Sequence, residues 1–163
     1  MACVALADGA GSRSRSEIGA EVVVRTTLRL LSAQFDAIYE MCVDAEESAR
    51  RHIHNRLLES VRRAASRHDC DVRALASTLL FVAHKGHRFL AGHIGDGLIA
   101  QIDEGGTPHT LSPPDNGEFA NETGVDARPG LRGLGLPGLG LRGFGGGAGG
   151  GFSGHVSGSF DRK

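Results

Sequence analysis

Two aspartates in glycine turns are the residues of this chain whose type and position best suit chemistry. Asp8 lies in the sequence A-D-G and Asp96 in the sequence G-D-G, and each follows an apolar segment. A carboxylate beside a free backbone carbonyl suits hard cations such as Mg²⁺ and Mn²⁺, which bind oxygen and keep several waters. On spacing alone a turn-forming role is favoured over cation binding, because Asp side chains stabilise turns by bonding to nearby backbone.

The glycines after Asp8 raise a different interpretation, a phosphate-binding loop. Gly9-Ala10-Gly11 stands between an apolar segment and a helical pattern, as in dinucleotide-binding folds. However, Ser14 occupies the place of the last glycine of G-x-G-x-x-G, and no G-K-S/T sequence follows. The sequence therefore does not favour nucleotide binding by this loop.

Histidines gather in two places. His84, His87 and His93 surround a lysine-glycine turn, and His52 and His54 lie close together in a helical pattern. Grouped histidines can bind a transition metal, but alternate positions of a strand face opposite ways. We therefore interpret these side chains as surface or half-buried imidazoles.

Arginines are interleaved with glutamates in the same helical pattern. The set comprises Arg50, Arg51, Arg56, Arg62 and Arg63, with Glu46, Glu47 and Glu59. Opposite charges at this spacing are typical of a solvated helix face. An R-G-F sequence near the C-terminus resembles RNA-binding segments but contains too few arginines for affinity. With a net charge of −1 and a pI of about 6.7, the chain lacks the basic field of a nucleic-acid binder.

An antiparallel sheet is expected to position the two aspartate turns. Residues 2–7 read as an apolar strand, and residues 74–111 alternate apolar segments with glycine turns, as a meander does. Apolar residues at helical spacing predict helices near 16–38 and 45–68. Capping boxes are expected at both helix starts, from Ser14 with Glu17 and from Asp44 with Glu47. This order of elements predicts an α+β fold with both helices on one face of an antiparallel sheet.

Glycine divides the chain into a globular part and a tail. Of its 25 glycines, 15 lie in residues 124–163, where no helix or strand period is visible. Such a segment has little to offset the backbone entropy that folding costs. We therefore predict one domain over residues 1–123 and a disordered glycine-rich tail over residues 124–163.

Membrane and disulfide patterns are absent from the sequence. No run approaches the roughly 18 apolar residues of a membrane span, and the N-terminal apolar segment is too short for a signal peptide. Cys3, Cys42 and Cys70 are odd in number and far apart, which argues against a disulfide framework. These features predict a cytoplasmic protein with reduced thiols and no membrane partner.

Several segments, in order along the chain, carry a resemblance to a known family. A-L-A-D-G-A-G-S at residues 5–12 is followed by S-E-I-G-A at 16–20, A-S-T-L-L at 76–80 and A-G-H-I-G-D-G at 91–97. Together with residues 112–123, these blocks resemble the bacterial branch of the metal-dependent protein phosphatase 2C (PPM-type) family. The resemblance implies an antiparallel β-sandwich flanked by helices, with Mn²⁺ or Mg²⁺ activating a water that attacks phosphoserine or phosphothreonine.

The resemblance also implies metal ligands by position. Asp8 matches the family's bridging aspartate, and Gly9 matches the glycine whose carbonyl oxygen binds one of the ions. Asp96 matches the aspartate of an accessory, weaker metal site, and no other catalytic residue is implied. The partner that the resemblance implies is a phosphoprotein substrate or its kinase.

The match is incomplete at both ends. The family's preceding strand with a Q-D motif and its later S-D-G and D-N blocks have no counterpart, and only Asp126 and Asp161 follow, in glycine-rich surroundings. One bridging carboxylate and one carbonyl leave a pair of divalent ions short of anionic ligands. We therefore expect a truncated domain with weak metal binding and little hydrolysis, or alternatively an inactive phosphatase-like binding or regulatory module. Its uncovered sheet edges would favour self-association.

Overall fold

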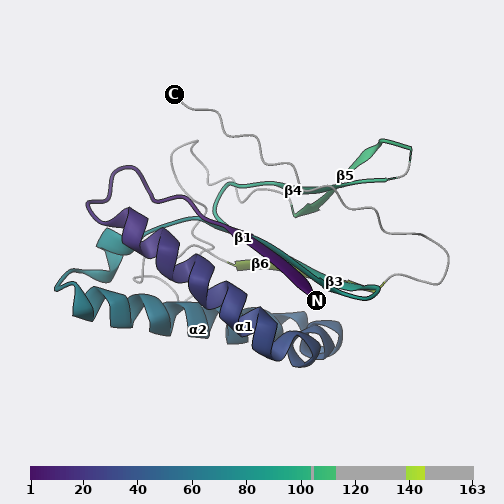
Figure 1. The fold of residues 1–163 in the computed structure, drawn as a ribbon, viewed down its shortest axis with the longest axis horizontal. Coiled ribbons are helices and arrows are strands. Elements are labelled where there is room, and N and C mark those ends of the chain that lie inside the picture. The colour runs from purple at the N-terminus through teal and green to yellow at the C-terminus, as the bar shows by residue number, and fades with distance from the viewer. Residues whose placement is uncertain (104, 113–138, 146–163) are drawn as a thin grey trace.

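The computed structural model describes residues 1–103, 105–112 and 139–145, with Ser112 and residues 139–145 described as backbone only. Figure 1 shows a sheet that lies over two helices, with a separate hairpin on the sheet's other side. The elements are β1 (Ala2–Leu6), α1 (Ser16–Asp44), α2 (Glu46–Arg67), a short 3₁₀ helix (Val72–Leu75), β2 (Leu79–Lys85), β3 (Arg88–Ile94), β4 (Ile99–Ile102), β5 (Pro108–Ser112) and β6 (Leu139–Gly145).

Four strands form the main sheet in the order β1-β2-β3-β6, and every neighbouring pair is antiparallel. At one end of the sheet Leu6 pairs with Leu80 and Ile94 pairs with Leu79. β1 and β3 therefore run in the same direction on either side of β2. The prediction that residues 2–7 and the first meander strands share one antiparallel sheet is confirmed.

The second hairpin leaves this sheet, contrary to the expectation of a single sheet over residues 74–111. β4 and β5 pair only with each other, in a two-stranded sheet. The chain turns at Gly95, whose φ of +99° suits glycine, and Gly97 then lies against Leu80. Apolar alternation identifies a strand but not the sheet that it joins, so the sequence could not place this hairpin.

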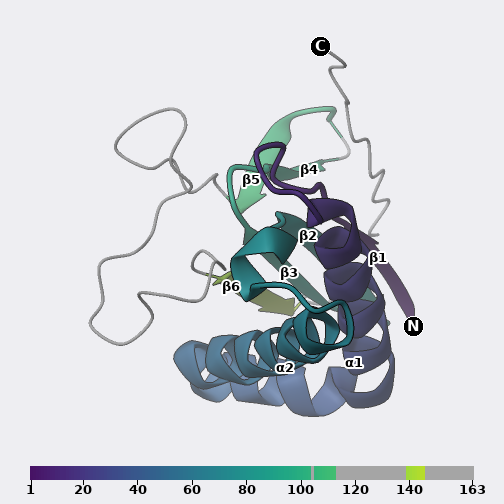
Figure 2. The ribbon, with the colours of Figure 1, turned by 90° about the vertical axis from the view of Figure 1, so that its left-hand side faces the viewer.

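Both helices cover the same face of the main sheet, as the sequence predicts. Figure 2 shows them side by side beneath the sheet, with β1 at the sheet's edge beyond α1. α1 extends past the predicted 16–38, with a kink at Gln34, whose φ of −132° and ψ of 21° are not helical. α2 closely follows the predicted 45–68. No helix in the described part of the chain has the length and apolarity needed to pass through a membrane.

The predicted capping boxes are wrong. Arg15 and Ala45 are the N-cap residues of α1 and α2, and neither makes a side-chain cap bond. The start of α1 is held from outside the helix, because the Arg15 amide donates to the Ala74 carbonyl at 3.2 Å. A capping pattern describes neighbouring residues only, so it could not predict this contact between distant parts of the sequence.

The core lies between the main sheet and the helices. Phe81 of β2, Leu31 and Ile38 of α1, and Ile53 and Leu57 of α2 are each at most 1 % exposed. Burying one such side chain stabilises the fold by about 1.5–3 kcal/mol. This apolar layer fixes the helices against one face of the sheet and so sets the positions of the strand ends.

A strand in the glycine-rich tail is the largest departure from the sequence analysis. The backbone of Leu139–Gly145 (β6) pairs antiparallel with the whole of β3. The prediction of a disordered tail is therefore wrong for these residues, and the rest of 124–163 lies outside the described residues. The edge of β3 presents a row of amide and carbonyl groups, and pairing with them offsets the entropy cost of ordering a glycine-rich segment.

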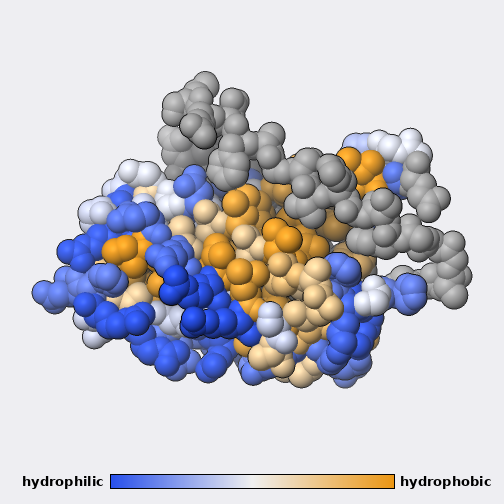
Figure 3. Space-filling view, in the orientation of Figure 1, coloured by the Kyte–Doolittle hydropathy of each residue, from blue (hydrophilic) through white to orange (hydrophobic). Residues whose placement is uncertain are grey.

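Along β1 the molecule exposes apolar side chains. Val4 is 53 % exposed and Leu6 is 39 % exposed. Figure 3 shows a band of apolar residues across the middle of the molecule, where β1 and α1 lie in Figure 1. The helices therefore cover one face of the sheet, while the other face of β1 is exposed to solvent.

Candidate metal centre

The register of the main sheet brings the two aspartate turns to the same end of the sheet. Asp8 follows Leu6, the last residue of β1, by two positions, and Asp96 follows Ile94, the last residue of β3, by two positions. Both strands end beside the start of β2. Two strand spacings of about 4.8 Å separate β1 from β3, so the turns leave the sheet roughly 10 Å apart.

Asp8 is held in place through its backbone. The Thr78 amide donates to the Asp8 carbonyl at 2.8 Å, and the Asp8 amide donates to the Thr78 hydroxyl oxygen at 3.0 Å. The Asp8 side chain is exposed, and no side chain in the described part of the chain pairs with its carboxylate. The backbone is therefore fixed while the carboxylate stays available to a ligand.

The Gly9 carbonyl is also available. Gly9 forms an isolated antiparallel bridge with Ser77. Both bonds of the bridge come from neighbours, from the Thr78 amide to Asp8 and from the Ala10 amide to the Ala76 carbonyl at 3.0 Å. In such a non-hydrogen-bonded pair the carbonyl of Gly9 points away from its partner strand. The turn thus offers one carboxylate and one adjacent carbonyl oxygen.

The start of α1 packs so closely on this turn that only glycine fits at position 9. A Cβ on Gly9 would lie 2.5 Å from Ser16 Oγ and 2.8 Å from the Ser16 carbonyl carbon. One helical turn later, a Cβ on Gly19 would lie 1.8 Å from the Leu75 carbonyl oxygen. These contacts clamp the Asp8 turn between α1 and the segment that leads into β2.

Asp96 is positioned by the glycines on either side of it. Gly95 turns the chain out of β3 with a positive φ, and a Cβ on Gly97 would lie 2.8 Å from both methyl carbons of Leu80. Leu80 is the neighbour of Leu6 across β1 and β2. The turn therefore folds back over the sheet end from which Asp8 emerges, with the Asp96 side chain exposed.

The arrangement supplies oxygen donors only, which suits a hard divalent cation that completes its shell with water. It does not supply a closed set of protein ligands. Over residues 1–103 and 105–112, no three His, Cys, Asp or Glu side chains gather as a metal-binding group. Asp126 and Asp161 lie outside the described residues. The donors present thus fit a partial, water-rich cation site.

Thr78 is a positioning residue that the sequence analysis did not single out. Its hydroxyl oxygen accepts from the Asp8 amide, and its own amide donates to the Asp8 carbonyl. A pair of small polar residues, Ser77 and Thr78, directly before an apolar strand was the available signal. The partner lies 70 positions away, so only the strand register identifies it.

The grouped histidines of the sequence are not gathered into a metal-binding group in the described part of the chain. His93 is buried at 4 % exposure, whereas His84 and His87 are exposed, and His52 Nε2 lies 3.0 Å from Gln34 Oε1. The helix arginines follow the solvated-face interpretation, with ion pairs from Arg50 to Glu46 and Glu47 and from Arg56 and Arg63 to Glu59.

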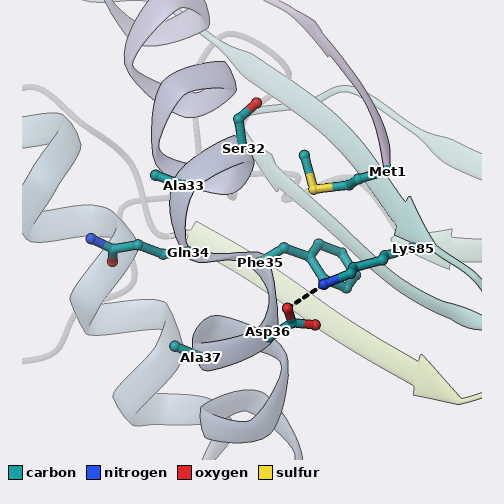
Figure 4. A pocket seen from close by; sticks show the side chains of 8 residues that line it. All are labelled: Met1, Ser32, Ala33, Gln34, Phe35, Asp36, Ala37 and Lys85. Atoms are coloured by element: carbon teal, nitrogen blue, oxygen red, sulfur yellow. Dashed lines mark hydrogen bonds and ion pairs between the residues drawn. The ribbon is translucent and has the colours of Figure 1, made fainter.

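One described pocket, of about 380 Å³, lies at the other end of the sheet. Figure 4 shows it between the N-terminus and the kink in α1, where Lys85 and Asp36 form an ion pair. Arg88 bonds to the same carboxylate, and these two cations lower the pKa of Asp36 below its usual value. The charged side chains that line this pocket, Asp36 and Lys85, pair with each other. Neither Asp8 nor Asp96 lines it.

The chain is similar in sequence to a protein family and in fold to several solved structures, among them the two phosphatase-related proteins that follow. The family model described as protein phosphatase 2C matches residues 1–128. PppA, a key regulatory component of T6SS in Pseudomonas aeruginosa, has a TM-score of 0.56 and 20 % identity, over 88 % of this chain and 60 % of that chain. The Mycobacterium tuberculosis serine/threonine phosphatase PstP/Ppp has a TM-score of 0.54 and 16 % identity, over 86 % and 63 %.

At these identities the two structures show a common fold. The chain spans less than two thirds of the length of each of them. No curated protein sequence matches the chain. The predicted α+β class, with antiparallel sheets flanked by helices, is confirmed.

Proposed function

Because the chain belongs to the protein phosphatase 2C family, we propose that its Asp8–Gly9 turn is the cation-binding element of a metal-dependent serine/threonine phosphatase domain. The observation that carries the proposal is that two oxygen donors of one turn, the Asp8 carboxylate and the Gly9 carbonyl, are free to bind a ligand. Asp8 presents a carboxylate and Gly9 a carbonyl, while their backbone is fixed by Thr78 and Ala76.

The cation would be Mn²⁺ or Mg²⁺, because all the available donors are oxygens. Asp8 and the Gly9 carbonyl would hold it, and Asp96 would bind an accessory ion at the same sheet end. When bound, such a cation would supply Lewis-acid chemistry by lowering the pKa of a coordinated water, which would then serve as the nucleophile toward phosphorus. The protein's own part is to fix the two oxygens through the bonds of Thr78 and the packing of Ser16 on Gly9.

The openness of the turns favours a phosphoprotein as substrate. Both carboxylates are exposed, and the two described pockets lie along α1, lined by neither aspartate. A phosphoserine or phosphothreonine on an exposed loop can reach such a surface, whereas a free small molecule needs a concave site for affinity. We therefore assign a protein phosphomonoester as the substrate class.

A second candidate function is a regulatory module that keeps the fold without the reaction. It is favoured by the ligand count, because residues 1–103 and 105–112 contain no group of three His, Cys, Asp or Glu side chains that could hold a metal ion. Such a module would bind a phosphoprotein or its kinase without hydrolysing it. It needs no cation at Asp8.

Hydrolysis of p-nitrophenyl phosphate and of a phosphothreonine peptide, with Mn²⁺ or with EDTA, tests the proposed function. We expect a slow turnover that requires Mn²⁺ and disappears in Asp8→Asn. It should be slow because one carboxylate and one carbonyl would hold the metal only weakly. Asp44→Asn is the matched control, since Asp44 lies at the far end of α1, and it should keep the rate. Equal rates in wild type, Asp8→Asn and EDTA would favour the regulatory module.

A further inference from the structure

The start of α1 and the end of α2 lie together at one end of the molecule. The Arg15 amide donates to the Ala74 carbonyl at 3.2 Å, and the Arg15 guanidinium donates to the carbonyl of His68, the residue that follows α2. Figure 2 looks onto this end, and Figure 3 shows it on the left, where hydrophilic residues predominate. Three segments therefore meet here: the loop before α1, the last turns of α2 and the 3₁₀ helix.

Arginines on these three segments have no carboxylate partner in the described part of the chain. The ion pairs there use other arginines, among them Arg50, Arg56 and Arg63 of α2, which pair with glutamates about one turn away. None of the pairs involves the arginines of this end, four of which are exposed and one half-buried. We call this set the arginine surface: Arg13, Arg15, Arg62, Arg67 and Arg73.

The arginine surface is positive although the chain as a whole is not. Its five arginines share this end with three acidic residues, Glu17, Asp69 and Asp71, which leaves a net charge of +2. The whole chain carries a net charge of −1. The Asp71 carboxylate also accepts from the Arg73 amide at 2.7 Å, within its own turn. Charge separated in this way attracts an acidic ligand to one end of the molecule.

The arginine surface borders the Asp8–Gly9 turn. The loop that carries Arg13 starts directly after this turn, and its Ala10 amide donates to the Ala76 carbonyl at 3.0 Å. The Ala76 amide in turn donates to the Arg73 carbonyl at 3.3 Å. Five positions separate Arg13 from Asp8, which is at most about 18 Å of extended chain. A bound peptide therefore needs only about five residues to reach from the turn to the arginines.

We propose that the arginine surface binds acidic residues of the phosphoprotein substrate, about three to six positions from the phosphorylated side chain; this inference rests on the proposed function. Guanidinium groups bind carboxylates through paired hydrogen bonds, and four of these groups are exposed. The Asp8 turn would receive the phosphoryl group, and the arginines would select the acidic sequence beside it. Continuity with this turn favours a protein segment over a nucleic acid, for which a net charge of +2 provides little attraction.

Fluorescence anisotropy of labelled phosphothreonine peptides measures this binding without requiring turnover. Two peptides are titrated with the full chain in EDTA: one carries Asp and Glu at the flanking positions, and the other carries Ser and Ala there. We expect the acidic peptide to bind about fivefold more tightly, because exposed ion pairs are weak singly and several act together. The preference should disappear at about 0.5 M salt, which screens exposed charges.

A double variant locates the binding. Arg13→Gln/Arg73→Gln should lose the preference for the acidic peptide, because it removes two charges that border the Asp8 turn. Arg29→Gln/Arg51→Gln is the matched control, since it changes the net charge equally and should keep the preference. Arg29 and Arg51 are exposed, in the middle of α1 and near the start of α2. Circular dichroism checks that both variants fold.

The outcomes separate this inference from the proposed function. Asp8→Asn should abolish Mn²⁺-dependent hydrolysis yet keep the preference for the acidic peptide. A preference in a chain without hydrolysis would uphold the arginine surface and assign it to the regulatory module. Equal binding of the two peptides to wild type, no binding of either, or equal losses in the two double variants would overturn the inference even where hydrolysis occurs. Tighter binding of a single-stranded oligonucleotide than of the acidic peptide would overturn it as well.

Discussion

Thr78 and Asp8 are joined by hydrogen bonds in both directions: the Thr78 amide donates to the Asp8 carbonyl at 2.8 Å, and the Asp8 amide donates to Thr78 Oγ1 at 3.0 Å. The two residues are 70 positions apart in sequence. Their bonds continue the β1–β2 ladder by one step past the end of β1. They fix the backbone of the turn that presents the Asp8 carboxylate and the Gly9 carbonyl.

Replacing Thr78 tests this positioning role. Thr78→Val keeps the side-chain shape but removes the acceptor of the Asp8 amide, which should cost about 1–2 kcal/mol of unfolding free energy. Thr78→Ser retains the hydroxyl and should cost less. Urea denaturation measures both. Equal losses in the two variants would show that the Oγ1 bond contributes nothing.

Gly19 should tolerate no side chain. In Gly19→Ala the new Cβ would lie 1.8 Å from the Leu75 carbonyl oxygen, so α1 must move away from the segment that leads into β2. We expect a loss of about 2–3 kcal/mol, even though alanine favours a helix more than glycine does. Gly11→Ala is the control, because nothing lies within 4 Å of the added carbon. A Gly19→Ala variant as stable as Gly11→Ala would contradict the close packing.

The contact between Gly97 and Leu80 should be visible in a double-mutant cycle. Gly97→Ala places a carbon 2.8 Å from both Leu80 methyl carbons and should destabilise the Asp96 turn. Leu80→Ala removes those methyl groups and makes room. The two substitutions together should therefore cost less than the sum of their separate costs. Additive losses, measured by thermal denaturation, would show that the two residues do not touch.

The stability of the chain should depend on pH through His54. Burial lowers the pKa of His54 below its ordinary value of 6.5, so the folded protein resists protonating this side chain. The unfolded chain then binds more protons, and stability falls as the pH drops through about 6.5. His54→Gln should flatten this dependence, and His52→Gln, on the same helix, should not. Denaturation midpoints between about pH 7.5 and pH 5.5 compare them.

The sequence was sufficient for the elements whose pattern is local. Apolar spacing identified α1, α2 and the strands β1 to β3, because each element buries one face against the same core. It missed β6, since glycine-rich residues carry no strand period and their order comes from the free edge of β3. It also placed β4 and β5 in the main sheet, because a glycine turn does not reveal where the chain goes next.

The sequence was sufficient to predict the residues of the candidate site but not the contacts that hold them in place. Asp8 and Asp96 stand out by their turns, and the register places both at the same end of the sheet. Their role as cation ligands stays a prediction. Thr78 and Ser16 act on the turn through contacts that only the folded chain creates, so no spacing rule could name them.

Calorimetric titration of the full chain with Mn²⁺ tests the central claim most directly, because it measures cation binding without requiring turnover. We predict weak binding of Mn²⁺ to wild type and unchanged binding to Asp44→Asn. Binding to Asp8→Asn should be at least tenfold weaker, which is a loss of about 1.4 kcal/mol of binding free energy. Asp96→Asn should affect only an accessory ion. Binding that is equal in wild type and Asp8→Asn, or absent from wild type at millimolar Mn²⁺, would contradict the account.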